Sequence, residues 1–187
     1  MKTLFIAALL IAGTFSHTSS NAQTVKKATL QASGLTCSMC SNAINKALRS
    51  ISYVENVKAN IQASSFDISF KPGSKVDFDE LKKKVEGAGF AVANLTATID
   101  FDNAAIANDQ HINSGGITFH FLNVKDQVLS GPVAIRILDK GFLTAKEFKK
   151  NSQFTKKVCY QTGVSGNSSC CSKDGIAAGT RIYHVTI

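Results

Sequence analysis

The sequence predicts an α+β protein in which a βαββαβ unit is followed by a small, mostly-β unit. In residues 25–96, four runs alternate apolar and polar side chains, and two runs repeat apolar side chains every three or four positions. These are the periods of half-buried strands and of helices with one buried face. Residues 97–187 are dominated by β-branched and aromatic runs between turn residues. We therefore expect two domains, at 25–96 and 97–187.

The first unit opens with a strand, in which Ala28, Leu30 and Ala32 alternate with polar residues until Gly34 breaks the pattern. A helix follows the cysteine-containing loop, because apolar side chains recur from Ile44 onward at helical spacing. The remaining expected elements are strands at 57–61 and 66–70, a helix from Asp77 to Gly87 with Gly89 just beyond it, and a strand at 90–95. Acidic residues suit the start of that second helix, and glycines suit its end.

The loop GLTCSMC, from Gly34 to Cys40, carries the most informative chemistry of the chain. It places Cys37 and Cys40 three residues apart at the start of a helix, where backbone N–H groups stabilise thiolates and lower their pKa. Thiolates are soft ligands that favour copper(I), zinc and similar ions. Zinc normally takes four ligands, and this loop offers two, so copper(I) is the favoured ion.

Residues 28–96 resemble the heavy-metal-associated domain of soluble copper chaperones and copper-transporting P-type ATPases. The resemblance is carried by GLTCSMC before a helix, by FDISF as a strand, and by VDFDELKKKVEGAGF ending in the pair Gly89-Phe90. It implies a ferredoxin-like fold, Cys37 and Cys40 as metal ligands, and Phe90 packed near the site. It also implies metal exchange with a protein partner such as a copper transporter or a cuproprotein.

One residue departs from the family pattern. Leu35 stands where the family usually has methionine, and we expect it to pack under the loop rather than to bind metal. Met39, between the two cysteines, is expected to face solvent, although a third, thioether ligand stays open. Mercury, zinc and cadmium remain alternative ions on the same chemical grounds.

The same two cysteines allow other interpretations. A C-x-x-C sequence at the start of a helix is also typical of thioredoxin-like enzymes, so an exported thiol-disulfide oxidoreductase is the alternative from another functional class. A structural disulfide between Cys37 and Cys40 is a further alternative. Because no nucleophile-base pattern or phosphate-binding loop stands out, we expect a binding protein rather than an enzyme.

The second unit is predicted to contain strands, one short helix and a linker. Thr144 and Glu147 form a capping-box pattern at the start of that helix. The expected strands are 96–101, 117–124, 132–138, 157–161 and 181–187; the helix is 144–151 and the linker or long loop is 103–116. This order matches a small OB-like barrel, and a sandwich fits nearly as well.

Three further cysteines, Cys159, Cys170 and Cys171, lie in the second half. A disulfide from Cys159 to one of the adjacent pair is one interpretation, since exported proteins commonly carry disulfides. A second soft-metal site made by all three is the other. Histidines 111, 120 and 184 are expected to be structural or exposed more often than metal-binding.

The N-terminus has the pattern of a signal peptide. A positive residue precedes a short apolar run, and small residues near Ala22 suit cleavage, so residues 1–22 would be removed and the mature chain would start at Gln23. We therefore expect an exported protein, periplasmic or secreted, with no transmembrane segment in the mature chain. The net charge is +8, but the lysines are dispersed along the sequence, so we expect no nucleic-acid partner.

Overall fold

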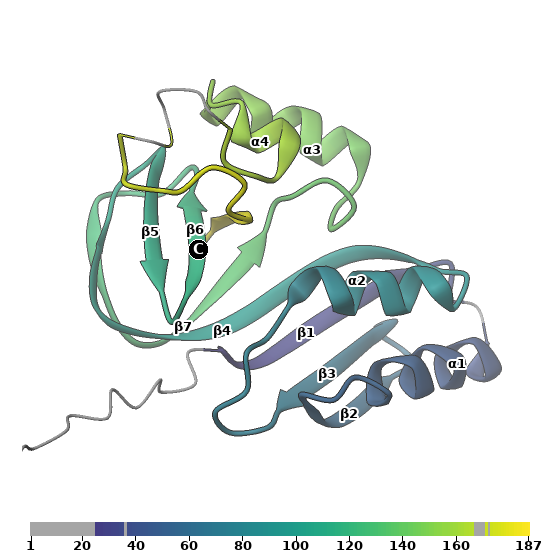
Figure 1. Cartoon of the computed structure of the whole chain (residues 1–187). Helices are drawn as coiled ribbons and strands as arrows, with labels where there is room; N and C mark the ends of the chain where they lie inside the picture. Colours follow the sequence, from purple (N-terminus) through teal and green to yellow (C-terminus); the bar gives the residue numbers. More distant parts are fainter. Residues whose placement is uncertain (1–24, 36, 167–170, 172) are drawn as a thin grey trace, which may run out of the picture.

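The computed structural model describes residues 25–35, 37–166, 171 and 173–187. The expected signal peptide, residues 1–22, lies outside this part of the chain. The described strands form one eight-stranded sheet in the order β2-β3-β1-β4-β7-β8-β6-β5 (Figure 1). The protein is therefore a mixed α+β structure built on a single large sheet.

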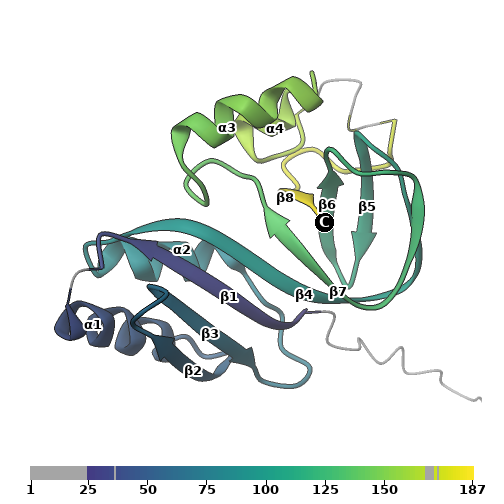
Figure 2. The same cartoon turned by 180° about the vertical axis from the view of Figure 1, so that it is seen from behind.

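The βαββαβ order expected for the first half is confirmed. Its elements are β1 Val25–Ser33, α1 Ser38–Arg49, β2 Val54–Asn60, β3 Ser65–Phe70, α2 Phe78–Gly87 and β4 Ala91–Ile106. Strand β1 pairs antiparallel with both β3 and β4, and β2 pairs antiparallel with β3. Both helices lie on one face of these strands, as Figures 1 and 2 show from opposite sides. Ile44 and Leu48 of α1 and Leu81 and Val85 of α2 are buried on that face.

The ends of α2 follow the chemistry expected from the sequence. Asp77 is the N-cap, and its carboxylate accepts hydrogen bonds from the backbone N–H groups of Asp79 and Glu80. Such a cap satisfies N–H groups that have no partner inside the helix. After the helix, Gly89 adopts φ +88°, a left-handed conformation that glycine reaches without the strain a side chain would add.

The second half continues the sheet of the first half. β4 pairs with β1 along its first part and with β7 Gln127–Ile137 from Thr96 onward. The predicted boundary at residue 97 thus lies inside one continuous strand. β7 is followed in the sheet by β8 Ile182–Thr186, β6 Ile117–Phe121 and β5 Gln110–Ser114, with β6 and β8 parallel. The expected separate OB-like barrel is not confirmed.

Two sequence predictions in this half were wrong. Residues 103–116 were expected to form a loop, but they contain the end of β4 and all of β5. β5 is polar because it is a terminal strand of the sheet, paired only with β6 among the described strands. Residues 157–161 were expected to form a strand, but Cys159–Thr162 form the short helix α4. Here tertiary packing overrides the β-propensity of Val158 and Tyr160.

Two helices and a 3-10 turn cover this end of the sheet. They are α3 Ala145–Asn151, η1 Ser152–Phe154 and α4. α3 begins with the expected capping box, in which Thr144 and Glu147 bond reciprocally. Tyr160 of α4 stacks on Phe148 of α3 at a ring separation of 4.6 Å, and both pack in a small cluster with Leu122 and other apolar residues.

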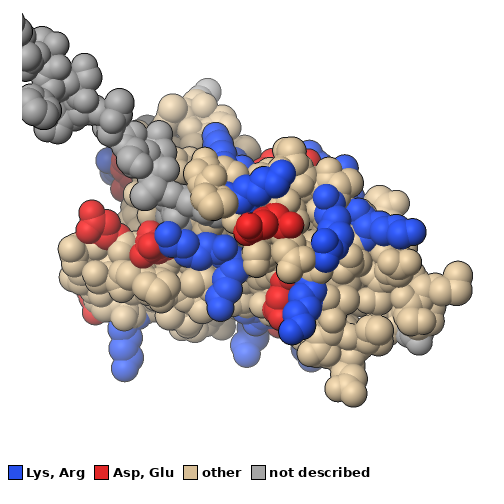
Figure 3. All heavy atoms as spheres, turned by 90° about the horizontal axis from the view of Figure 1, so that it is seen from below, with Lys and Arg blue, Asp and Glu red and all other residues tan. Residues whose placement is uncertain are grey.

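Charged residues are mixed on the visible surface. On the face drawn in Figure 3, lysine and arginine are interspersed with aspartate and glutamate rather than gathered into one basic stripe. On this face the charged side chains thus form no basic stripe. Within the described residues, no helix has the length and apolar character needed to cross a membrane.

Candidate metal centre

Cys37 and Cys40 lie together at the exposed start of α1. Cys37 is the N-cap of the helix, with extended backbone angles (φ −149°, ψ 160°), and Cys40 lies in the first turn. The Cys37 sulfur accepts a hydrogen bond of 3.3 Å from the backbone N–H of Cys40. A cysteine thus takes the place that serine or aspartate usually holds at a helix start. Neither sulfur is buried in the core, so both are within reach of an ion or a partner.

The two sulfur atoms are 2.7 Å apart. This separation is longer than a disulfide bond of about 2.05 Å. It is shorter than the distance between two sulfurs that each lie about 2.3 Å from a shared ion. Two sulfurs that share one ion would therefore have to lie farther apart than they do here. The residues present fit a two-thiolate site.

The thiols differ in acidity. A hydrogen bond from the Cys40 thiol, followed by the Cys40 backbone N–H, lowers the pKa of Cys37. The pKa of Cys40 is raised, first because its thiol donates that bond to Cys37. The sequence predicted that the helix start would lower the pKa of both cysteines, and this was wrong for Cys40. The proton that remains in the pair is held by Cys40, so Cys37 is the better thiolate.

The exposure of Met39 is as the sequence predicted, whereas the packing of Phe90 near the thiols stays a prediction. Leu35 and Phe90 are partly buried and pack against the main core. Met39 is 82% exposed and faces solvent. From Ser33 to Asn45 the sequence contains no Asp, Glu, Lys or Arg. The loop and the first half of α1 therefore contribute no charged side chain beside the thiols.

The structure describes two of the three cysteines that the sequence suggested as a second metal site. Cys159 and Cys171 are both buried, in a small cluster with Ile182. Cys170 lies outside the described residues. The pairing of these cysteines and their joint binding of metal stay predictions.

The structure brings His111 and His120 to Cys159 instead. Nε2 of His111 lies 3.5 Å from the Cys159 sulfur, and Nδ1 of His120 lies 3.9 Å from it. Burial lowers the pKa of His111, and it lowers the pKa of His120 to about 2, so both imidazoles are neutral near pH 7. Sequence reasoning treated these histidines singly and missed the cluster. Strand register joins them: His111 is opposite His120, and His120 is opposite His184.

Comparison with known proteins bears on the first half of the chain. Residues 29–91 match the family model of the heavy-metal-associated domain. A copper-exporting P-type ATPase of Staphylococcus saprophyticus is 37% identical over 75 residues, which are 40% of this chain and 9% of the ATPase. Among solved structures, CopZ metallochaperone is 25% identical with a TM-score of 0.34, covering 36% of this chain and 98% of that one. Oxidized MerP from Ralstonia metallidurans is also 25% identical, with a TM-score of 0.34 and coverage of 37% and 94%.

The βαββαβ unit of the first half is the part of the chain that the family model matches. Residues 29–91 of this chain are a heavy-metal-associated domain. The chain spans 9% of the length of the related ATPase, so the match concerns this domain and not the transport machinery.

Proposed function

We propose that this protein is an exported copper(I)-binding protein that captures the ion through Cys37 and Cys40 and releases it to a partner. The observation that carries the proposal is the convergence of the exposed Cys37 and the half-buried Cys40 at the start of α1, inside the matched domain. Soft thiolates favour copper(I), and the related sequence belongs to a copper-exporting ATPase. The protein acts as a chaperone or sequestering protein and not as an enzyme.

The geometry also suggests how the ion is exchanged. Two ligands leave part of the coordination sphere of copper(I) open, so a thiolate of the partner enters before either cysteine leaves. The lack of charged residues from Ser33 to Asn45 and the exposed Met39 side chain favour contact with an apolar or neutral patch. A copper transporter or a cuproprotein with its own exposed thiols is the expected partner.

Anaerobic titration with copper(I) in competition with a chelator tests the proposal on the full chain. We expect tight binding of one ion at this site, with two sulfur ligands in the copper X-ray absorption spectrum. Cys37→Ser and Cys40→Ser should each weaken binding by more than the roughly 100-fold that loss of a mere supporting contact costs. Met39→Leu is the matched control, because it changes the residue between the ligands and should leave affinity unchanged. Unchanged affinity in both cysteine variants would contradict the proposal.

The unequal acidity of the two thiols favours a second candidate, an exported thiol-disulfide oxidoreductase. A low-pKa thiol beside a second cysteine at a helix start suits attack on a disulfide. Insulin-reduction assays and a measured reduction potential separate the two functions. Rapid disulfide turnover without copper(I) binding would favour the enzyme.

Competition between copper(I) and mercury(II), zinc or cadmium on the reduced protein decides among the ions.

Export is proposed from the N-terminal sequence. Fractionation of the native host should place the protein outside the cytoplasm, and N-terminal sequencing should find Gln23 as the first residue. Full-length protein retained in the cytoplasm would contradict this part of the proposal without affecting metal binding.

A further inference from the structure

Three histidines form a buried row across adjacent strands of the second half. His111 of β5, His120 of β6 and His184 of β8 occupy opposed positions in the two strand pairs. Their exposed fractions are 7%, 0% and 0%. The rings of His111 and His120 are 4.2 Å apart, and those of His120 and His184 are 5.0 Å apart. Polar rings packed this closely in a core need partners for their nitrogens.

In His111 and in His120, one ring nitrogen is hydrogen-bonded to a carboxylate. Nδ1 of His111 is 2.6 Å from Asp174, and Nε2 of His120 is 2.9 Å from Asp109. An ionised carboxylate only accepts hydrogen bonds, so each of these nitrogens carries the proton. In a neutral ring the other nitrogen then presents a lone pair. Both lone pairs are on the nitrogens nearest to Cys159.

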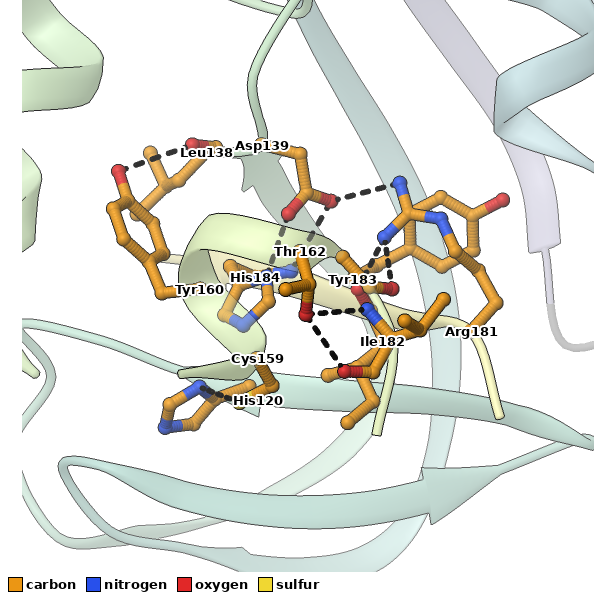
Figure 4. A network of polar contacts seen from close by, with 12 residues as sticks. His120, Leu138, Asp139, Cys159, Tyr160, Thr162, Arg181, Ile182, Tyr183 and His184 are labelled. Atoms are coloured by element: carbon orange, nitrogen blue, oxygen red, sulfur yellow. Dashed lines mark hydrogen bonds and ion pairs between the residues drawn. The ribbon is translucent and has the colours of Figure 1, made fainter. Parts of the chain in front are cut away.

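His184 repeats the same arrangement. Its Nδ1 is 2.6 Å from the buried carboxylate of Asp139, which assigns the lone pair to Nε2. That Nε2 is buried and has no hydrogen-bond partner within the described part of the chain. Figure 4 shows this nitrogen on the side of the ring that faces Cys159 and His120. His184 is not part of the group whose ligand atoms lie within 4.8 Å of one another, so it is not counted as a ligand.

The distances suit one transition-metal ion. The ligand atoms of His111, His120 and Cys159 all lie within 4.8 Å of one another. In a tetrahedral site with metal bonds of about 2.0–2.3 Å, nitrogen and sulfur are about 3.6 Å apart. The two nitrogen-sulfur distances of 3.5 and 3.9 Å fall around that value. Carboxylates behind the imidazoles are the usual support of metal-binding histidines.

We propose that His111, His120 and Cys159 bind one transition-metal ion of the zinc class, with Asp174 and Asp109 orienting the two imidazoles. Imidazole together with thiolate favours zinc or copper over magnesium or calcium. The Lys157 ammonium lies near His111, but it is 3.5 Å from the Asp174 carboxylate and donates to the Asp109 carbonyl, so its charge is balanced locally.

This site is separate from Cys37 and Cys40. The start of α1 and the β5, β6 and α4 region lie at opposite sides of the molecule (Figure 1). Direct transfer of an ion between the two sites within one chain is therefore not supported. The second site holds its ion in the core, as a fixed component of the second half.

Cobalt(II) is a suitable probe because its spectrum reports coordination. The test uses the full chain with the substitutions Cys37→Ser and Cys40→Ser, which lacks the first thiol pair. Whether the first site binds copper(I) therefore does not affect the result. Titration of the reduced protein should give one cobalt per chain, with visible d–d bands and a sulfur-to-cobalt charge-transfer band. Zinc(II) should displace cobalt, raise the melting temperature and slow alkylation of Cys159.

Variants assign the ligands. Cys159→Ser should abolish the charge-transfer band, and His111→Gln or His120→Gln should remove tight binding. Asp174→Asn and Asp109→Asn should lower affinity by about 10- to 100-fold. Cys171→Ser is the matched control, since Cys171 is buried in the same cluster as Cys159 and lies outside the proposed ligand set. Circular dichroism of each metal-free variant verifies folding.

Clear results would overturn the proposal. One is the absence of cobalt and zinc binding by the folded, reduced double variant. Another is a spectrum that survives in folded Cys159→Ser but is lost in Cys171→Ser. A third is a native disulfide at Cys159, found by mass spectrometry of the unreduced protein, because a disulfide sulfur cannot serve as a thiolate ligand.

Discussion

The guanidinium of Arg181 in β8 donates a hydrogen bond of 2.6 Å to the carboxylate of Asp79 in the first turn of α2. The same guanidinium reaches Asp139 at 3.2 Å, and Asp139 in turn holds His184 (Figure 4). The Cζ atom of this guanidinium also lies 4.1 Å from the centroid of the Tyr183 ring. One side chain thus joins the heavy-metal-associated domain to the histidine row of the second half.

Replacing Arg181 should destabilise the fold. Arg181→Met leaves the nearly buried Asp139 without its guanidinium partner and leaves Asp79 with only the Lys82 ammonium at 4.0 Å, and a partly buried carboxylate that loses its cation is costly. We expect the free energy of unfolding to fall by about 2–3 kcal/mol in urea denaturation. Lys26→Met is the control: it breaks an exposed pair with Asp100 and should cost less than about 1 kcal/mol. Equal effects of the two variants would contradict the assigned role.

Stability should depend on the ionisation of Glu147 at low pH. The hydrogen bond from Arg136, followed by those from Thr144, lowers the pKa of Glu147 from 4.5 to about 2. Because the folded-state pKa is the lower one, the contribution is complete above pH 4.5 and is lost as the pH falls towards 2.

The comparison of wild type with Glu147→Gln measures this contribution. The pair is partly exposed, so the stability difference near pH 6 should be about 1 kcal/mol or less, and it should vanish near pH 2. Glu86→Gln, at an exposed position of α2, should show a smaller difference near pH 6. A Glu147→Gln difference that stays constant from pH 6 to pH 2 would refute the assigned linkage.

Two glycines at the end of α2 should respond oppositely to alanine. Gly87 is the last residue of the helix and has open space where a Cβ would lie, so Gly87→Ala should stabilise by about 0.5 kcal/mol. Gly89 also has open space but holds φ +88°, so Gly89→Ala should destabilise by about 1 kcal/mol through backbone strain. Thermal denaturation of both variants provides the comparison, and stabilisation by both would rule out the strain argument.

Asp77 should contribute both as a helix cap and as a contact to β8. Its Oδ1 accepts from the N–H of Asp79 at 2.9 Å and from the Tyr183 hydroxyl at 3.0 Å. Asp77→Ala should cost about 1–2 kcal/mol, whereas Asp77→Asn retains an acceptor and should cost less. A double-mutant cycle with Tyr183→Phe, followed by urea denaturation, isolates the contact between the halves; strict additivity would show that none exists.

Local patterns were sufficient for the elements of the first half. The alternation from Ala28 to Ala32 and the spacing from Ile44 to Leu48 report burial directly, because one face of each element meets the core. The capping residues Asp77 and Thr144 likewise act on their own helices. Elements that depend on such short-range interactions can be predicted without knowledge of the rest of the chain.

Patterns failed where long-range pairing decides the structure. The polar segment 110–114 is a strand because it pairs with β6. Residues 159–162 form a helix although they contain Tyr160, a residue type that favours strands. β4 runs through residue 97 and pairs with strands of both halves, so the sheet is continuous across the predicted domain boundary. The division into two domains stays a prediction.

The sequence by itself determined the βαββαβ element order of the first half, the loop with Cys37 and Cys40, and the expectation of a soft metal ion that two thiolates favour. All of these depend on residues close together in the chain. Only the tertiary structure decided that His111 and His120 meet Cys159, and that Arg181 reaches Asp79. Strand register and side-chain packing bring these distant residues together, and no local period encodes which strand lies beside which.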